Sequence, residues 1–138
     1  MKKKLATLLF LFITHFSISQ SQSYTYSSSG EYEFDKSLNS FKFLENSYEE
    51  SKTIIDIDEK QKEIFITRIF KSSNAGLERT GEKYYYVKKE LKDSGFKYYA
   101  IDLVNKKYVE LIISLEQTSI AENCNGFTGC NKITTFLK

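Results

Sequence analysis

The two cysteines of the chain, Cys124 and Cys130, are the residues whose type and spacing could most plainly do chemistry. Five residues separate them, which is too many for a thioredoxin-type pair of reactive thiols. Two thiolates also fall short of the four ligands of a structural zinc site. Gly126 and Gly129 let the intervening backbone double back until the Cα atoms come within bridging distance. We therefore predict a disulfide between Cys124 and Cys130, with two free buried thiols as the alternative.

The compartment decides how a thiol behaves, and the first residues indicate export. A basic stretch at residues 2–4 precedes an apolar run at residues 5–13, and small polar residues follow. This layout is typical of a secretory signal peptide, and the apolar run is far shorter than the roughly 20 residues of a membrane-spanning helix. We predict a signal peptide over residues 1–19, cleaved after residue 19, 21 or 23 in that order of preference. The protein would then be periplasmic or secreted, whereas a buried N-terminal helix is the alternative.

Removal of this leader changes the chemistry open to the chain. Without Lys2, Lys3 and Lys4, 17 basic residues face 18 acidic ones, so the net charge of +2 becomes −1. Both signs are interspersed, which argues against nucleic acid as a partner. The leader also carries the only histidine, His15. Its loss excludes Ser-His and Cys-His nucleophile pairs and imidazole-based zinc sites, so we expect a non-catalytic protein without cofactor or metal. No cysteine lies near the cleavage site, so no stable membrane anchor is expected there.

Paired carboxylates are the remaining enzymatic option. Glu31 and Glu33 would share one strand face, as would Asp56 and Asp58. Two acids across a cleft can hydrolyse a glycosidic bond, but acids side by side on one strand more often form a solvated edge. A carboxylate-dependent glycoside hydrolase is therefore the least favoured function.

Short runs of alternating or β-branched residues dominate the rest of the chain and predict about six or seven strands. We predict a single all-β domain, mainly antiparallel, over residues 30–138, after a flexible lead-in at residues 20–29. It would be a small meander barrel or a strongly curved sheet, with a C-terminal loop pinned by the disulfide. This architecture is similar to lipocalin-like exported barrels, although none of their diagnostic residues can be placed here. The clearer candidate strands are residues 31–35, 53–57, 63–70, 83–91, 96–104 and 107–115, and the weaker candidates are residues 41–44 and 132–137.

Some segments admit two interpretations. Residues 107–115 could form a helix, but their β-branched side chains favour a strand. The polar residues 71–82 predict a long loop, and residues 117–123 one helical turn. The Asp-Ser-Gly sequence at residues 93–95 predicts a tight turn with its glycine at positive φ.

Tyrosines interleaved with lysines provide the main indication of function. A tyrosine presents a flat apolar ring and a polar tip, which suits sugars, peptides and other hydrated partners. We predict that a sheet face binds a glycan, a small apolar ligand or another exported protein, and an inhibitor or immunity-type protein is the alternative. Tyrosine is also simply a good strand residue, so cross-strand packing is the competing explanation. The candidate binding residues are Tyr84, Tyr86, Tyr98, Tyr99, Tyr108, Lys88 and Lys97.

Overall fold

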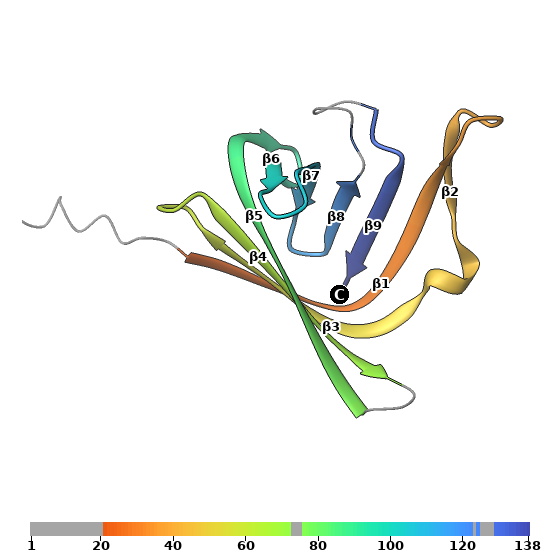
Figure 1. Cartoon of the computed structure of the whole chain (residues 1–138), viewed down its shortest axis with the longest axis horizontal. Helices are drawn as coiled ribbons and strands as arrows, with labels where there is room; N and C mark the ends of the chain where they lie inside the picture. The colour runs from red at the N-terminus through yellow and green to blue at the C-terminus, as the bar shows by residue number, and fades with distance from the viewer. Residues whose placement is uncertain (1–20, 73–75, 123, 125–128) are drawn as a thin grey trace, which may run out of the picture.

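The computed structural model describes residues 21–72, 76–122, 124 and 129–138 (Figure 1). The predicted signal peptide at residues 1–19 lies outside this range. The described residues form nine strands and one short 3-10 helix, so the all-β prediction is confirmed, with more strands than predicted. The elements are β1 (Ser21–Asp35), β2 (Ser40–Phe43), η1 (Glu45–Ser47), β3 (Glu49–Asp58), β4 (Glu63–Ser72), β5 (Gly76–Lys92), β6 (Gly95–Asp102), β7 (Lys107–Ile113), β8 (Gln117–Glu122) and β9 (Lys132–Leu137).

Eight of these strands close into an antiparallel barrel. From β3 to β9 each strand pairs with the next along the chain, β1 pairs with β3, and β9 returns to pair with β1. The closing ladder runs from the pair of Ser28 and Leu137 to the pair of Glu33 and Lys132. The ninth strand, β2, pairs only with the end of β1 and stands outside the barrel (Figure 1). Of the two architectures left open by the sequence, the closed barrel is the one observed.

The interior of the barrel is filled by side chains. All eight barrel strands contribute at least one of them because alternate residues of a strand point to the same face. Interiors of barrels of this size are just wide enough to be packed in this way. The buried cluster consists of Tyr26, Ile55, Ile57, Ile64, Ile66, Tyr84, Tyr86, Tyr98, Ala100, Val109, Leu111, Ile113, Ile120 and Phe136.

Aspartate side chains fix two of the hairpin turns. The Asp58 carboxylate accepts the backbone N–H groups of Lys60 and Gln61, each at 2.9 Å, between β3 and β4. Asp102 accepts those of Val104 and Asn105 at 2.9 and 3.1 Å, between β6 and β7. A carboxylate that accepts the backbone N–H groups two and three residues later fixes a turn. These turns need no proline, and this sequence has none.

Three polar segments differ from prediction, because all three are strands. The predicted lead-in at residues 20–29 belongs to β1 from Ser21 onward, where Gln22, Tyr24 and Tyr26 alternate with serine and threonine. The predicted loop at residues 71–82 is largely the outer part of the β4–β5 ribbon. The predicted helical turn at residues 117–123 is β8, with Thr118 and Ile120 buried. Pairing with neighbouring strands supplies the hydrogen bonds in each case, although the local pattern is weak.

Two irregularities in the ladders reset which side chains face the interior. In β5, Val87 is an extra residue between the pairs of Tyr86 with Ala100 and Lys88 with Tyr99. Between the pairs of Tyr26 with Thr53 and Ser28 with Glu50, a single residue of β1 faces two residues of β3. Such bulges bend a strand and redirect its side chains.

Gly95 serves a purpose other than the predicted one. Positive φ among the described glycines occurs at Gly76 and Gly129, and not at Gly95. A Cβ at Gly95 would lie 2.1 Å from the carbonyl oxygen of Ile113. Glycine is therefore needed here because the backbones of β6 and β7 approach so closely.

Among the described residues, no helix has both the length and the apolar character needed to cross a membrane.

Candidate binding surface

The barrel wall separates the predicted binding residues into two groups. Tyr84, Tyr86 and Tyr98 point into the barrel, where 4%, 5% and 0% of their surface is exposed. Tyr99, Tyr108, Lys88 and Lys97 lie on the outer side. The tyrosines therefore do not form one sheet face, and those inside belong to the packed core rather than to a surface open to a partner.

The bulge at Val87 explains why Lys88 faces away from Tyr84 and Tyr86 of the same strand. Regular alternation would place Lys88 on the inner face with Tyr84 and Tyr86. The extra residue shifts the phase, so Lys88 pairs with the outward-facing Tyr99 and Lys89 pairs with the buried Tyr98. A one-residue shift moves every later side chain to the opposite face.

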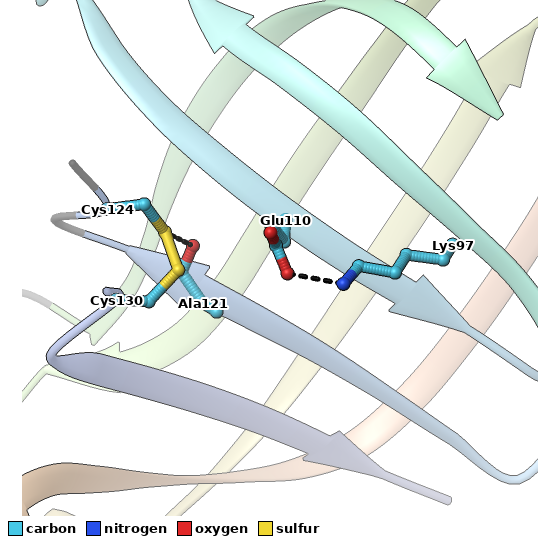
Figure 2. The surroundings of a disulfide bond; sticks show 5 residues. All are labelled: Lys97, Glu110, Ala121, Cys124 and Cys130. Atoms are coloured by element: carbon cyan, nitrogen blue, oxygen red, sulfur yellow. Dashed lines mark hydrogen bonds and ion pairs between the residues drawn. A yellow bond between two sulfur atoms is a disulfide. The ribbon is translucent and has the colours of Figure 1, made fainter. Parts of the chain in front are cut away.

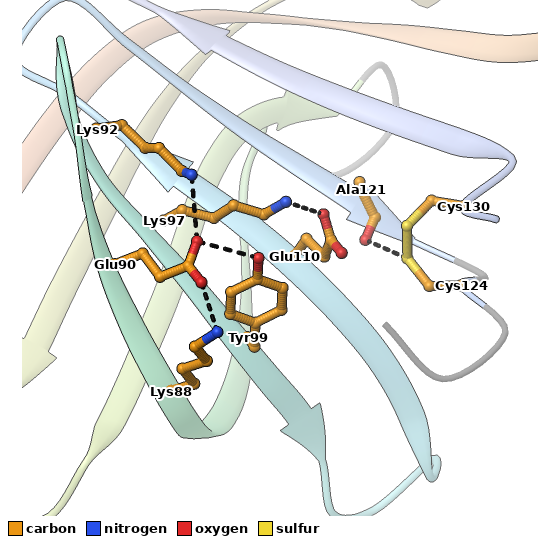
Figure 3. A network of polar contacts seen from close by, with 9 residues as sticks. All are labelled: Lys88, Glu90, Lys92, Lys97, Tyr99, Glu110, Ala121, Cys124 and Cys130. Carbon is orange, nitrogen blue, oxygen red and sulfur yellow. Dashed lines mark hydrogen bonds and ion pairs between the residues drawn. A yellow bond between two sulfur atoms is a disulfide. The ribbon is translucent and has the colours of Figure 1, made fainter. Parts of the chain in front are cut away.

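On the outer side, Tyr99 lies between two lysines. The ammonium groups of Lys88 and Lys97 are 5.2 and 4.9 Å from the centre of its ring, which is within the range of cation-π attraction. The Tyr99 hydroxyl donates to Glu90 Oε2 at 3.2 Å. The Glu90 carboxylate also forms ion pairs with Lys88 and Lys92, whose Nζ atoms lie 2.5 and 3.2 Å from its oxygens. Figure 3 shows these contacts. These contacts hold the ring of Tyr99 in one orientation on the barrel surface.

Each outer lysine of this group is paired with a carboxylate. Lys97 Nζ lies 2.6 Å from Glu110 Oε2 on β7. Partial burial lowers the pKa of Lys97, but the pair with Glu110 outweighs it and the pKa is raised overall. The hydrogen bond to Glu90 raises the pKa of Lys88. Hydrogen bonds from Lys88 and Lys92 lower the pKa of Glu90 to about 2. These shifts keep Lys88, Lys97 and Glu90 charged near neutral pH, and the two carboxylates offset most of the formal charge of the three lysines.

Beside this network, aromatic side chains cross four neighbouring strands. Tyr85 on β5 is opposite Ile101 on β6, which is opposite Tyr108 on β7. Phe65 on β4 is opposite Lys83 and therefore lies diagonally from Tyr85, whose own partner on β4 is Glu63. Phe65, Tyr85 and Tyr108 are 37%, 37% and 39% exposed. We call the outward-facing residues Phe65, Tyr85, Tyr99, Ile101 and Tyr108 the outer wall.

Phe65 and Tyr85 were not among the predicted binding residues. The signal for Phe65 was present, because it stands between Ile64 and Ile66, which are buried. Once those two isoleucines are assigned to the interior, Phe65 must face outward. Tyr85 stands in the same way between Tyr84 and Tyr86, but tyrosine on either side gave no indication of which face is buried.

A second polar cluster lies inside the barrel, near the turn between β3 and β4. The Glu59 carboxylate accepts a hydrogen bond from the Tyr86 hydroxyl at 2.5 Å and forms an ion pair with Lys89. Burial opposes ionisation of Glu59, but the hydrogen bonds from Lys89 and Tyr86 outweigh it, and its pKa is lowered. Burial raises the pKa of Tyr86, so its hydroxyl stays protonated as a donor.

The predicted disulfide is present. Cys124 and Cys130 are bonded, with their Cα atoms 3.7 Å apart. Figure 2 shows the bridge next to the end of β8. The Sγ atom of Cys124 lies 3.3 Å from the carbonyl oxygen of Ala121. A disulfide is compatible with a periplasmic or extracellular protein, since such bonds persist in oxidising compartments.

The paired carboxylates do not face one another across a cleft. Glu31 forms an ion pair with Lys132 at 2.9 Å, and Asp58 is engaged in its turn. Glu33 and Asp56 are exposed on their strands. Within residues 21–72, 76–122, 124 and 129–138, no three acidic, cysteine or histidine side chains are placed to hold a metal ion.

Comparison with protein-family models, with curated proteins and with solved structures gave no match for this chain.

Proposed function

We propose that this chain is an exported binding module that contacts a protein partner through the outer wall. The observation that carries the proposal is the exposure of Phe65, Tyr85 and Tyr108 on the outward faces of β4, β5 and β7 around a filled barrel. Aromatic residues are enriched where proteins bind one another, and clustered exposed apolar groups mark such surfaces.

The filled interior argues for an outside surface over an internal carrier site. A small apolar ligand inside the barrel would have to displace side chains such as Tyr98 and Phe136, which are fully buried. The lysines that flank the outer wall already have carboxylate partners, so strong attraction to an anionic partner is not expected. The outer wall is therefore suited to a partner that presents apolar and hydrogen-bonding groups. An inhibitor or immunity-type protein, which blocks another exported protein, would use its surface in this way.

A matched pair of double variants tests the proposal. Phe65→Ser with Tyr85→Ser removes aromatic area from the outer wall. Phe41→Ser with Tyr48→Ser removes similar area elsewhere, since Phe41 and Tyr48 are 39% and 59% exposed. Tagged wild-type and variant proteins are used to recover partners from the native envelope and medium, and binding of the recovered partner is then measured with purified proteins.

We expect the outer-wall variant to bind the partner about tenfold more weakly or worse, because central aromatic residues dominate interface energies. The Phe41 and Tyr48 variant should bind like the wild type, and both should retain the wild-type circular dichroism spectrum. Equal loss in both double variants, or no loss in either, would contradict a role for the outer wall.

Export, with loss of residues 1–19, is part of the proposal. It is supported by the basic and apolar pattern of the leader and by the disulfide between Cys124 and Cys130. Mass spectrometry of the protein from its native source should find a chain that begins at residue 20, 22 or 24, with both sulfurs protected from alkylation. A chain that still carries Met1, with both thiols open to alkylation, would rule export out.

A further inference from the structure

Two hollows of about 470 and 180 Å3 adjoin on the outer face of the barrel, across the neighbouring strands β7, β8, β9 and β1 (Figure 1). They meet at two cross-strand pairs of β8 and β9, Gln117 with Leu137 and Ser119 with Thr135. The first residue of each pair lines the larger hollow, and the second lines the smaller one. The two hollows therefore form one trough that runs across the strands.

The floor of this trough is low because its residues are small. The register joins Ile112, Ser119, Thr135 and Gly30 in one row from β7 to β1. Thr135 faces outward and is still only 7% exposed, and its Oγ1 lies 3.3 Å from the Oγ of Ser119 in a hydrogen bond. Three strand spacings of about 4.8 Å give the row a length of roughly 14 Å, which is room for about three sugar rings. The trough therefore suits a linear molecule.

At the β1 end, Gly30 and the turn η1 build an aromatic wall. A Cβ at Gly30 would lie 2.8 Å from Cε2 of Phe43, so glycine lets the ring of Phe43 lie against β1. The Ser47 hydroxyl of η1 accepts the backbone N–H of Glu31 at 2.8 Å. This bond fixes η1 to β1 and places the next residue, Tyr48, in the lining of the smaller hollow with 59% of its surface exposed.

At the β7 end, polar groups lie beside apolar ones. The Gln117 side-chain amide donates to the Oγ of Ser119 at 3.2 Å. Ile112 and Leu115 are 41% and 68% exposed and supply apolar lining. No lysine or arginine is among the described residues that line either hollow. An anionic ligand is therefore not favoured.

The chemistry of the trough distinguishes between linear ligands. A peptide could not add a strand across it, because the backbone groups of β7, β8, β9 and β1 are already paired within the sheet. An acyl chain would cover the hydroxyls of Ser119 and Thr135 without offering them a hydrogen bond. A neutral glycan has apolar ring faces that pack on aromatic side chains and hydroxyl groups that pair with polar ones.

We propose that this trough, the glycan trough, binds a neutral chain of N-acetylated amino sugars. One sugar ring would pack on Tyr48, and sugar hydroxyls would pair with Ser119. An acetamido group would occupy the larger hollow, with its methyl against Ile112 and Leu115 and its polar atoms paired with Gln117. The acetamido methyl matches the mainly apolar lining better than the hydroxyl of a plain hexose does.

Titration of the purified, disulfide-bonded protein with triacetylchitotriose tests the proposal, with cellotriose as the comparison ligand because it lacks acetamido groups. The amide signals of Gly30, Tyr48, Gln117, Ser119 and Thr135 are followed by NMR. We expect saturable shifts at these amides with triacetylchitotriose and an affinity at least about tenfold lower for cellotriose. No saturable shift with triacetylchitotriose, or equal binding of cellotriose, would overturn the proposal. Shifts that depend on protein concentration without sugar would overturn it too, since a second copy would then fill the trough.

Two matched pairs of variants separate binding from folding. Tyr48→Ala should weaken binding of triacetylchitotriose about tenfold, whereas Tyr108→Ala on the outer wall should leave it unchanged. Gln117→Met keeps the length of the side chain but removes the amide and should weaken binding about fivefold, whereas Gln61→Met should have no effect. All four side chains are exposed, so each variant should keep the wild-type circular dichroism spectrum. A Tyr48→Ala variant that binds as tightly as the wild type would show that the trough is not the site.

The glycan trough shares no residue with the outer wall, so the two proposals can fail separately. The double variant of Phe65 and Tyr85 should lose the protein partner and keep the sugar. The double variant of Phe41 and Tyr48 should keep the protein partner and lose the sugar. Loss of sugar binding in the variant of Phe65 and Tyr85 would contradict the placement of the sugar in the trough.

Discussion

The ammonium group of Lys89 lies between the carboxylate of Glu59 and the ring of Phe96, whose centre is 4.1 Å from Nζ. Both charged side chains are mostly buried, at 26% and 28% exposure. The lysine is therefore held by attraction to a carboxylate and to an aromatic face in a place that water reaches only in part.

Lys89→Met should destabilise the protein by about 2 kcal/mol, because it leaves the Glu59 carboxylate partly buried without its cation. Lys88→Met is the matched control. Lys88 is the preceding residue, but it lies on the outer face with 61% of its side chain exposed, so its loss should cost much less. Urea denaturation measures both. Equal losses in the two variants would show that the bulge at Val87 does not separate them as described.

Gly95→Ala should destabilise the barrel by about 2 kcal/mol, since the new Cβ would collide with the carbonyl oxygen of Ile113 at 2.1 Å. Gly81→Ala is the comparison, because nothing lies within 4 Å of its Cβ position. That change should be neutral or slightly stabilising, as alanine restricts the unfolded chain more than glycine does. Thermal unfolding of the two variants checks the difference. A neutral Gly95→Ala would mean that β6 and β7 do not approach so closely.

Replacing both Cys124 and Cys130 by serine should lower stability by about 2 kcal/mol, the amount that the chain-entropy estimate gives for so short a loop. The bridge lies next to a main-chain contact that anchors β9. The N–H of Asn131 donates to the carbonyl of Glu122 at 3.3 Å, and its carbonyl accepts from the N–H of Phe34 at 2.9 Å. Unfolding with and without a reductant measures the effect. The wild type under reducing conditions should match the double serine variant, and a wild type that is indifferent to reductant would contradict this.

The Glu90 carboxyl should titrate at about 2, well below its usual value of 4.5, because Lys88 and Lys92 bind its charged form. A carboxyl with a lowered pKa contributes stability above its unfolded pKa and loses it as the pH falls from about 4.5 toward 2. Glu90 lies on the outer face of the barrel, where solvent and salt screen its ion pairs, so this contribution is small. NMR titration of the side chain is the direct measurement. Replacing both Lys88 and Lys92 with methionine should return the pKa of Glu90 toward 4.5. An unchanged pKa in this double variant would refute the assigned cause.

The sequence predicted those elements best that have one clearly apolar face. Strand β9 was predicted with the bounds that it has, and β7 was correctly preferred as a strand, with Val109, Leu111 and Ile113 buried. Strand β8 was missed because Ser119 and Ala121 alternate only weakly with Thr118 and Ile120. The outer part of the β4–β5 ribbon was missed for a related reason. It is exposed on both faces, so it carries no apolar alternation to detect.

The candidate site was harder to predict because it depends on one inserted residue. The tyrosine and lysine pattern correctly marked β5, β6 and β7 as aromatic strands. Nothing in the local sequence marks Val87 as a bulge, and yet this residue decides whether Lys88 or Lys89 faces the interior. A single-residue shift of this kind is fixed by pairing with the next strand, which no local pattern reveals.

The ladder between β1 and β9 joins the first described strand to the last, with Glu33 opposite Lys132. During synthesis β1 therefore cannot pair with β9 until the ribosome has made nearly all of the described chain. Contacts so distant in sequence are slow to form, because the intervening segment must first be brought into order. The barrel can therefore close only after its final strand has emerged from the ribosome, so its closure is a late step of folding.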